Sequence, residues 1–263
     1  MLPTTIFLFA HQDDEIGVMH VLATLAANGR RVLCLYLTNG AFRGNSPQRR
    51  NKESLRVLAG LGVGADAVRF IGTELDIPDG ALAQHLVRAD AAILACLAEV
   101  GSIERIIMHA YEGGHQDHDA AHVLGIRAAQ RSGTLASARQ FTLYRATALP
   151  FLPHVMFRPL AANGPVEETP IPVVERLRFL LHCLSYRSQP LALLGLLPLM
   201  AIDYLFSGRQ KLQPVAMARL VERPHPGALL YERRNRAIFA DVNAATTAFL
   251  DTGPTSLSAA PPA

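Results

Sequence analysis

The length, composition and charge of the chain favour a soluble globular protein with one large domain. Its 263 residues lie within the range of a single decorated α/β domain. Half of the residues are hydrophobic and 18% are charged, which excludes a disordered chain, and no apolar run is long enough to span a membrane. The net charge is +3 without a basic block, so we expect no binding of nucleic acid.

The cysteines and the first residues favour a cytoplasmic location. Cys34, Cys96 and Cys183 lie far apart in apolar surroundings, which is typical of core residues in a reducing compartment. The chain begins Met-Leu-Pro-Thr-Thr, without the basic segment and long apolar segment of an export signal. We therefore expect a cytoplasmic protein.

Strands and helices are expected to alternate along the first half of the chain. Short apolar runs predict strands over residues 5–10, 32–37, 67–71 and 103–110. Helical spacing of apolar residues predicts helices over residues 16–27, around 55–61, over 81–100 and over 119–131. Apolar strands joined by helices form right-handed crossovers, so we expect an α/β, Rossmann-like fold with a mainly parallel sheet flanked by helices.

The pattern becomes irregular after residue 131. A strand over residues 141–146 is followed by four prolines between positions 150 and 165, which indicate irregular or edge-strand structure. A helix is expected over residues 173–184. We expect a single domain over residues 1–263, with a core of about 3–147, a helical and irregular C-terminal part of about 148–250 and a frayed tail of 251–263.

Residues 191–206 form an unusually apolar segment. Pro198 and Asp203 interrupt it, and it is shorter than the roughly 20 residues of a membrane span. We favour a buried helical segment that packs on the domain or forms the interface of a homo-oligomer. The alternative is an apolar wall, or a patch in weak contact with a membrane surface, that serves a lipid-linked sugar.

Two polar clusters follow the first and fourth predicted strands. Residues 11–15 read His-Gln-Asp-Asp-Glu, and residues 113–119 read Gly-Gly-His-Gln-Asp-His-Asp. In open parallel sheets, ligands bind outside the carboxyl ends of the strands. Either cluster alone is consistent with a helix cap, but several carboxylates buried together need a compensating cation. Because zinc accepts imidazole and carboxylate ligands, the sequence predicts a catalytic metal site with an open position for water.

The two clusters resemble the motifs of the PIG-L/LmbE-like family of zinc-dependent N-deacetylases, which includes N-acetylglucosaminyl-phosphatidylinositol de-N-acetylase. The resemblance covers residues 5 to about 190 and rests on residues 10–15 and 114–118, with weaker similarities at 38–40, 50–53 and 186–189. Gln12 and Gln116 replace prolines that are usual in the family, and Gly113 replaces a tyrosine that some members have. The resemblance implies a hydrolase that acts on a small-molecule or glycoconjugate substrate containing an N-acetyl amino sugar.

The resemblance also implies the roles of individual residues. One Zn²⁺ ion per chain would be held by His11, Asp14 and His118. Asp13 would act as the general base for a metal-activated water that attacks the acetamide carbonyl. A protonated His115 would stabilise the oxyanion, and Asp117 would orient a histidine. Either Asp13 or His115 could return the proton to the leaving amine.

Other interpretations of the sequence stay open. Arg50 could bind a substrate hydroxyl or phosphate, or could form an intrahelical ion pair with Glu53. His109 is expected to be a hydrogen-bonded sheet residue rather than a ligand. A sugar-nucleotide-binding protein is the first alternative function, although the glycine-rich phosphate-binding pattern is missing. A non-catalytic metal-binding protein is the second, and the intact Asp13 argues against it.

Overall fold

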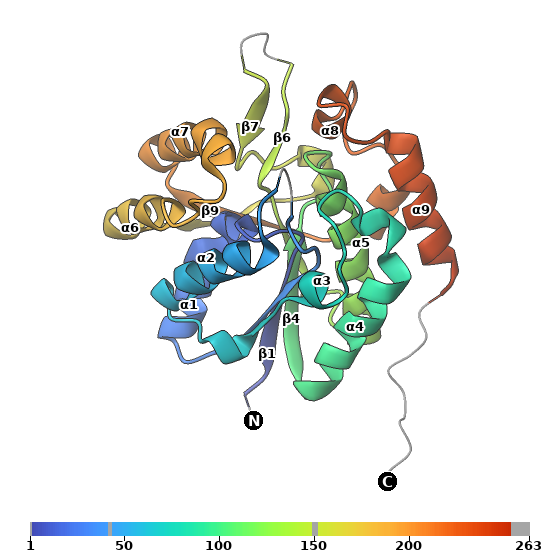
Figure 1. Cartoon of the computed structure of the whole chain (residues 1–263), viewed down its shortest axis with the longest axis horizontal. Helices are drawn as coiled ribbons and strands as arrows, with labels where there is room; N and C mark the ends of the chain where they lie inside the picture. Colours follow the sequence, from blue (N-terminus) through green and yellow to red (C-terminus); the bar gives the residue numbers. More distant parts are fainter. Residues whose placement is uncertain (1, 42–43, 149–151, 254–263) are drawn as a thin grey trace.

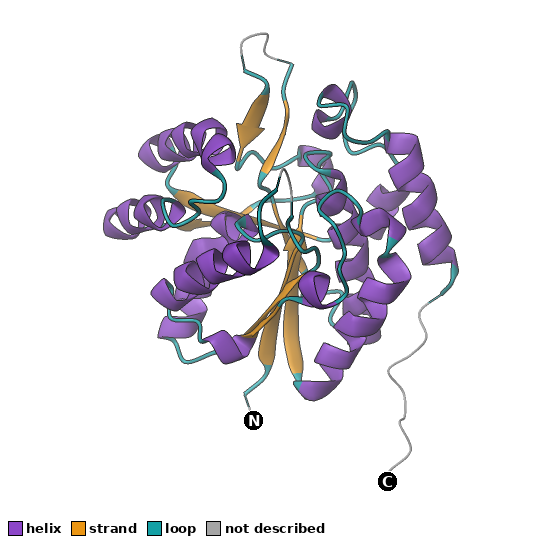
Figure 2. Ribbon diagram, in the orientation of Figure 1, coloured by secondary structure: helices purple, strands orange, loops and turns teal. Residues whose placement is uncertain are grey.

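A seven-stranded sheet with helices on both faces forms the centre of the molecule (Figures 1 and 2). The structure is a computed structural model and describes residues 2–41, 44–148 and 152–253. The strands are β1 Thr4–Phe9, β2 Arg31–Tyr36, β3 Val68–Arg69, β4 Ile103–His109, β5 Arg139–Phe141, β6 Tyr144–Ala146, β7 His154–Met156, β8 Glu167–Pro170 and β9 Arg209–Pro214. The helices are α1 Met19–Ala27, α2 Pro47–Gly60, α3 Ile71–Glu74, α4 Leu86–Glu99, α5 Gln116–Arg131, α6 Val173–Cys183, α7 Pro190–Phe206, α8 Leu230–Arg233 and α9 Phe239–Asp251.

The sheet has the strand order β3-β2-β1-β4-β5-β9-β8. The first five strands in this order are parallel, whereas β9 pairs antiparallel with β5 and β8 pairs antiparallel with β9. The predicted mainly parallel, Rossmann-like fold is therefore confirmed. The strand order reverses between β1 and β4, which are neighbours in the sheet but distant in sequence.

Alternate residues of the central strands fill the two hydrophobic cores. On one face of the sheet, Ile6 and Leu8 pack with residues of α4, α5 and α9. On the other face, Phe7 and Phe9 pack with residues of α1, α2, α6 and α7. This alternation follows from the two-residue period of a strand and explains why β1 is buried throughout and apolar from Ile6 to Phe9.

Several predicted elements differ in extent from the structure. The third strand is only two residues long, and the helix predicted over residues 81–100 is interrupted at His85. The strand predicted over 141–146 is divided between β5 and β6, which belong to different sheets. The chain turns there because the buried Glu112 carboxylate accepts hydrogen bonds from the backbone N–H groups of Leu143 and Tyr144.

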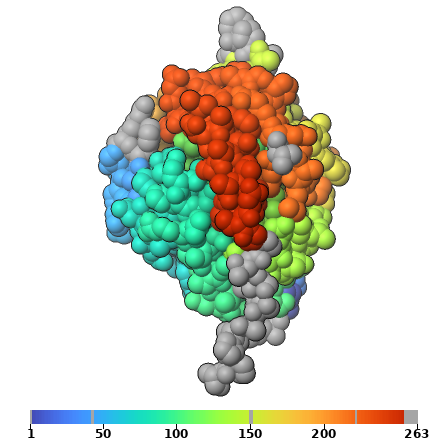
Figure 3. All heavy atoms as spheres, turned by 90° about the vertical axis from the view of Figure 1, so that its right-hand side faces the viewer, coloured from blue at the N-terminus to red at the C-terminus, as the bar shows by residue number. Residues whose placement is uncertain are grey.

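The C-terminal part is integrated into the core. Strands β8 and β9 extend the main sheet, and α9 packs on α4 and α5, where Figure 3 shows it on the outside of the molecule. Residues after the predicted core of about 3–147 therefore contribute to both hydrophobic cores, and the single domain over residues 1–263 stays a prediction. Of the predicted frayed tail, residues 254–263 lie outside the described part of the chain.

Residues 190–206 form one helix, α7, which packs on the domain along one side, as expected, and is exposed along the other. Leu193 and Leu197 pack against the core beside α6, whereas Leu194 and Leu205 are each 74% exposed. No helix in the described ranges is long and apolar enough to cross a membrane. A homo-oligomer stays a prediction.

The two sides of α7 should respond differently to polar substitution. We expect Leu193→Asn with Leu197→Asn to lower the free energy of unfolding by about 2 kcal/mol per site, the low end for buried leucines because both are only partly covered. The matched variants Leu194→Asn and Leu205→Asn should each change it by less than about 0.5 kcal/mol. Urea denaturation measures both, and equal losses would contradict this packing of α7.

Candidate active site

The two polar clusters meet at the carboxyl ends of β1 and β4. The helix that follows β1 covers one face of the sheet and the helix that follows β4 covers the other, so the clusters lie where the strand order reverses. This crevice is the position at which open α/β sheets bind ligands. The structure thus brings together residues that are about 100 positions apart in the sequence.

The Asp14 side chain lies at the centre of the cluster. Its Oδ2 accepts a hydrogen bond from the backbone N–H of His11 at 2.6 Å and lies 3.0 Å from His109 Nε2. Its Oδ1 lies 3.2 Å from His118 Nε2, and His11 Nδ1 is 3.4 Å from Oδ2. Of the three ligands predicted from the resemblance, His11 and His118 therefore both lie within contact distance of the third, Asp14.

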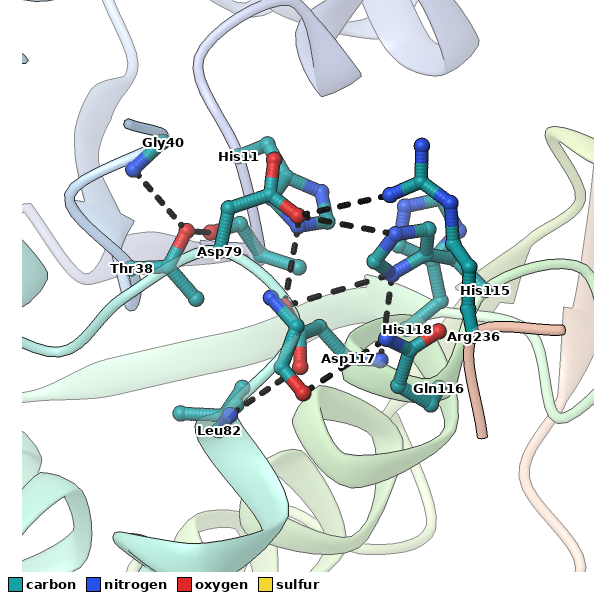
Figure 4. A network of polar contacts seen from close by, with 12 residues as sticks. His11, Thr38, Gly40, Asp79, Leu82, His115, Gln116, Asp117, His118 and Arg236 are labelled. Atoms are coloured by element: carbon teal, nitrogen blue, oxygen red, sulfur yellow. Dashed lines mark hydrogen bonds and ion pairs between the residues drawn. The ribbon is translucent and has the colours of Figure 1, made fainter. Parts of the chain in front are cut away.

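Asp117 fixes the orientation of the His11 ring. Its Oδ2 is 3.0 Å from His11 Nε2 and 2.6 Å from the backbone nitrogen of Gly80, and its Oδ1 accepts a hydrogen bond from the N–H of Leu82 at 3.0 Å (Figure 4). A proton on His11 Nε2 leaves the lone pair on Nδ1, the atom that faces Asp14. Histidine ligands of metals are commonly held by a carboxylate in this way. Asp117 is fully buried behind His11, which fits a positioning role.

The surroundings of His118 fit a metal ion. The His118 side chain is completely buried, and neither ring nitrogen has a hydrogen-bond partner. Among the described residues, three groups have donor atoms within 4.8 Å of one another: His11 with His115 and His118, Asp14 with His109 and His118, and His11 with Asp79 and Asp117. The group of Asp14, His109 and His118 provides two imidazoles and a carboxylate, which are ligands that zinc accepts. The predicted set of His11, Asp14 and His118 is not one of these three groups, although His11 and His118 each contact Asp14.

Asp13 is held beside Asp14 in an unusual backbone conformation. Its φ of 114° lies in a region that non-glycine residues rarely adopt, and its N–H donates to Glu15 Oε2 at 3.0 Å. Arg50 approaches the Asp13 carboxylate at 3.3 Å. Burial raises the pKa of Asp13 to about 8, although Arg50 opposes this shift, and the neighbouring Asp14 adds to it. A carboxylate with such a pKa suits proton transfer near neutral pH.

His115 forms the N-cap of α5. Its Nδ1 accepts a hydrogen bond from the Asp117 N–H at 3.2 Å, which starts the helix three residues before the predicted position. Burial, together with the positive charges that His11, His118 and Arg236 would carry, lowers the pKa of His115 well below its usual value. The lowered pKa disfavours the protonated His115 that was expected from the sequence. Because Nδ1 accepts a hydrogen bond, the neutral ring carries its hydrogen on Nε2.

Arg50 does not form the intrahelical ion pair with Glu53 that was one of its two interpretations, and its binding of substrate stays a prediction. The guanidinium is 3% exposed and donates to the carbonyl oxygens of Gln12 and Gly40 besides Asp13. Glu53 instead contacts Arg49 and accepts hydrogen bonds from Ser188. Arg50 thus supports the loops around Asp13 and also lines the cavity above it.

A cavity of about 440 Å³ opens above these residues. His11, Asp13, Asp14 and His115 form part of its polar floor, and the first residues of α7 form an apolar wall. Asp79, which was not predicted from the sequence, also lines this cavity. Its carboxylate lies 3.6 Å from His11 Nε2 and 3.7 Å from His115 Nε2 (Figure 4). Its place in a Pro-Asp-Gly turn was the only local signal.

Two further cavity regions were not predicted. The Tyr144 ring lines the cavity, and its centroid lies 5.3 Å from that of the His118 ring. The nearby Tyr111 instead donates its hydroxyl hydrogen to the Glu222 carbonyl oxygen. Arg234 and Arg236, which also line the cavity, come from the segment after α8.

His109 lies beneath the floor of the cavity and contacts Asp14. This position agrees with the predicted hydrogen-bonded sheet residue.

Asp117→Asn should weaken metal binding without removing the ligands. An amide oxygen at this position accepts a weaker hydrogen bond from His11 Nε2 than a carboxylate does, and it carries no negative charge to orient the ring. We therefore expect the zinc affinity to fall by about 10- to 100-fold. Competition with a chelator measures the change. Asp90→Asn is the control, because Asp90 is a buried carboxylate that pairs with Arg131 away from the cavity. Equal zinc affinity in Asp117→Asn and the native protein would contradict the role of Asp117.

The fold and the site together define a Rossmann-like α/β protein with a buried histidine and aspartate cluster suited to a metal ion. The model of the PIG-L family, described as GlcNAc-PI de-N-acetylase, matches residues 6–129. The resemblance predicted from the two motifs is thereby confirmed. No curated protein matches the sequence.

Solved deacetylase structures share the fold. The A40926 pseudoaglycone deacetylase Dbv21 is 19% identical, with a TM-score of 0.59 over 85% of this chain and 98% of its own. The zinc inhibited form of teicoplanin deacetylase Orf2 is 16% identical, with a TM-score of 0.54 over 81% and 98%. The N,N'-diacetylchitobiose deacetylase from Pyrococcus horikoshii is 14% identical, with a TM-score of 0.55 over 80% and 84%.

Proposed function

We propose that the protein hydrolyses the N-acetyl group of a substrate that contains an amino sugar. The observation that carries this proposal is the convergence of a metal-type cluster and a separate carboxylate, Asp13, on the floor of one cavity. The family match over residues 6–129 and the deacetylase names of the similar structures support the reaction type. The substrate class is a small molecule or glycoconjugate.

In this proposal, His11, Asp14 and His118 hold one zinc ion. His118 supplies a nitrogen that has no other partner, and the contact with Asp117 directs His11 Nδ1 toward Asp14. When bound, zinc lowers the pKa of water toward about 7 and polarises the amide carbonyl. His109 and the His11 N–H occupy Oδ2 of Asp14, which favours Oδ1 as the ligand atom.

Asp13 serves as the general base in the proposed mechanism. Its carboxylate lines the cavity and takes the proton of the attacking water, while Arg50 restricts its orientation. The neutral His115 donates its Nε2 hydrogen to the carbonyl oxygen as negative charge develops there. The C–N bond then breaks, and Asp13 returns to the leaving nitrogen the proton that it took from the water, because the neutral His115 has no acidic proton to give. The products are the protonated amine and acetate.

The polar rim gives the substrate its orientation. Asp79 and Arg236 lie 4.0 Å apart at the cavity, so that an acceptor and a donor for sugar hydroxyls are side by side. Arg50 remains our proposed substrate-facing residue on this floor, in addition to its support of Asp13.

Amine release from a panel of N-acetylated sugars tests the function. We expect purified, zinc-loaded protein to release amine from at least one N-acetylglucosamine derivative, and chelation should stop the release. The panel should contain free and phosphate-linked N-acetylglucosamine, an N-acetylated disaccharide and a glycolipid. Zinc retention without amine release from any of these, combined with tight binding of a nucleotide sugar, would favour the sugar-nucleotide-binding alternative.

A further inference from the structure

Every exposed residue of α7 is apolar. Leu191 is 71% exposed, Leu194 and Leu205 are each 74% exposed, and Phe206 is 80% exposed. Positions 191, 194, 198, 202 and 205 follow one side of the helix, and its one acidic residue, Asp203, is buried on the other side. A helix at a water-exposed surface normally carries polar side chains on its outer side. The outer side of α7 therefore has the composition of a contact surface.

Helix α6 extends this apolar surface. It packs against α7, and it leaves Val174, Leu177 and Leu181 between 59 and 77% exposed (Figure 1). Of the fifteen exposed large apolar side chains among the described residues, ten lie within residues 173–206. We name these ten side chains the α6–α7 face. Such a concentration differs from the scattered single apolar residues of ordinary protein surfaces.

The α6–α7 face continues into the cavity. Leu191 belongs to the face and also lines the cavity, together with Ala192, Gly195 and Leu196 of the same helix. Tyr144 and His154 of the β6–β7 hairpin and Arg234 after α8 also line the cavity. A surface that covers the α6–α7 face would thus lie beside the opening of the cavity.

The charges near the face are predominantly positive. The two acidic residues of this segment are both paired, since Glu175 contacts His20 at 2.7 Å and the buried Asp203 contacts Lys211 at 3.2 Å. Arg187, in the turn between α6 and α7, and Arg234 at the cavity are exposed. The guanidinium groups can pair with the phosphate groups of an anionic bilayer, and the apolar surface beside them can contact the acyl chains.

We propose that the α6–α7 face docks on the surface of an anionic lipid bilayer, with the cavity opening beside the contact. At about 25 Å, or roughly 1.5 Å per residue, α7 is too short to span the bilayer, and it lies in the interface. A second copy fits this face less well. Protein interfaces usually contain one hydrogen bond per roughly 100–200 Å², and the outer side of α7 offers no polar side chain for one.

Cosedimentation with vesicles tests the docking. We expect the native chain to bind vesicles of phosphatidylcholine with 30% phosphatidylglycerol, and to bind pure phosphatidylcholine more weakly. Leu194→Gln with Leu205→Gln should lower the partition coefficient by about tenfold or more, because both side chains are exposed apolar contacts of the face. Neither residue lines the cavity, so activity on a water-soluble substrate should stay unchanged.

A matched control separates the face from general hydrophobicity. Leu2 and Val87 are 52 and 68% exposed and lie outside the face, so Leu2→Gln with Val87→Gln should keep native vesicle binding. If the first pair fails to fold, Leu177→Gln with Leu181→Gln on α6 is judged by the same criterion.

Three outcomes would overturn the docking. They are the absence of native binding to either vesicle, unchanged binding of the α7 variant, and a native dimer that the α7 substitutions dissociate, which would make a second copy the occupant. Vesicle binding is measured without any substrate, so its result does not depend on the proposed deacetylation.

Discussion

His118→Ala is expected to remove the bound zinc and nearly all amine-releasing activity. The His118 ring is fully buried, neither nitrogen has a hydrogen-bond partner, and Nε2 lies 3.2 Å from Asp14 Oδ1. His118 is also one of only three proposed protein ligands. Its loss should therefore reduce zinc affinity by more than the roughly 10- to 100-fold expected for a residue that only supports a ligand. Elemental analysis after dialysis gives the zinc content. Full zinc content in the variant would contradict the assignment of His118.

Two comparisons separate ligand loss from unfolding. His122 is also a buried histidine of α5, but its ring hydrogen-bonds the His109 carbonyl at 2.7 Å. We expect His122→Ala to lose stability and keep its zinc. A metal at 100 times its Kd adds about 2.7 kcal/mol to stability, so chelation should lower the Tm of the native protein. The Tm of His118→Ala should not respond to the chelator.

The central part of the site follows directly from the sequence. The apolar runs identify β1 and β4, and the rule that ligands bind at the strand ends places residues 11–14 and 115–118 together before any contact is known. Local sequence alone identifies the two strands and the polar residues that follow each of them. The pairing of β1 with β4 in the sheet then brings Asp14 to within 3.2 Å of His118.

The remainder of the site depends on contacts between distant segments. Asp79 reaches the cavity because Asp117 binds the backbone of Gly80 and Leu82, and Tyr144 reaches it because Glu112 binds the chain at residues 142–144. The buried carboxylates that hold these loops come from the second polar cluster and the residue before it. No periodicity in residues 77–80 or 142–144 reveals such a partner, so the sequence analysis could not place them.

The orientation of α7 also exceeds what the sequence can predict. Apolar residues occupy almost every position of the segment, so its pattern has no polar side from which the buried side could be inferred. The expected burial on the domain or at a subunit interface therefore did not specify which side of the helix faces the core. In the structure, α6 and β7 contact α7, and the outer side of the helix is left exposed.

Asp13→Asn is expected to keep zinc and to lower the rate of amine release by about 10²- to 10⁴-fold, the usual contribution of a general base. The asparagine has nearly the same shape, and its carbonyl oxygen can still accept the contact from Arg50. It cannot take a proton from water, so only the chemical step should suffer. Zinc content and kcat measured on one preparation test both statements.

Glu15→Gln is the matched control for Asp13→Asn. Glu15 is the neighbouring carboxylate of the same cluster, but it does not line the cavity, and its Oε2 accepts the backbone N–H of Asp13. A glutamine oxygen can preserve this contact, so we expect a rate within about tenfold of the native rate, because any change would act only through the position of Asp13. A large loss in Glu15→Gln with a near-native rate in Asp13→Asn would transfer the base role to Glu15. Loss of zinc in Asp13→Asn would instead make Asp13 a ligand.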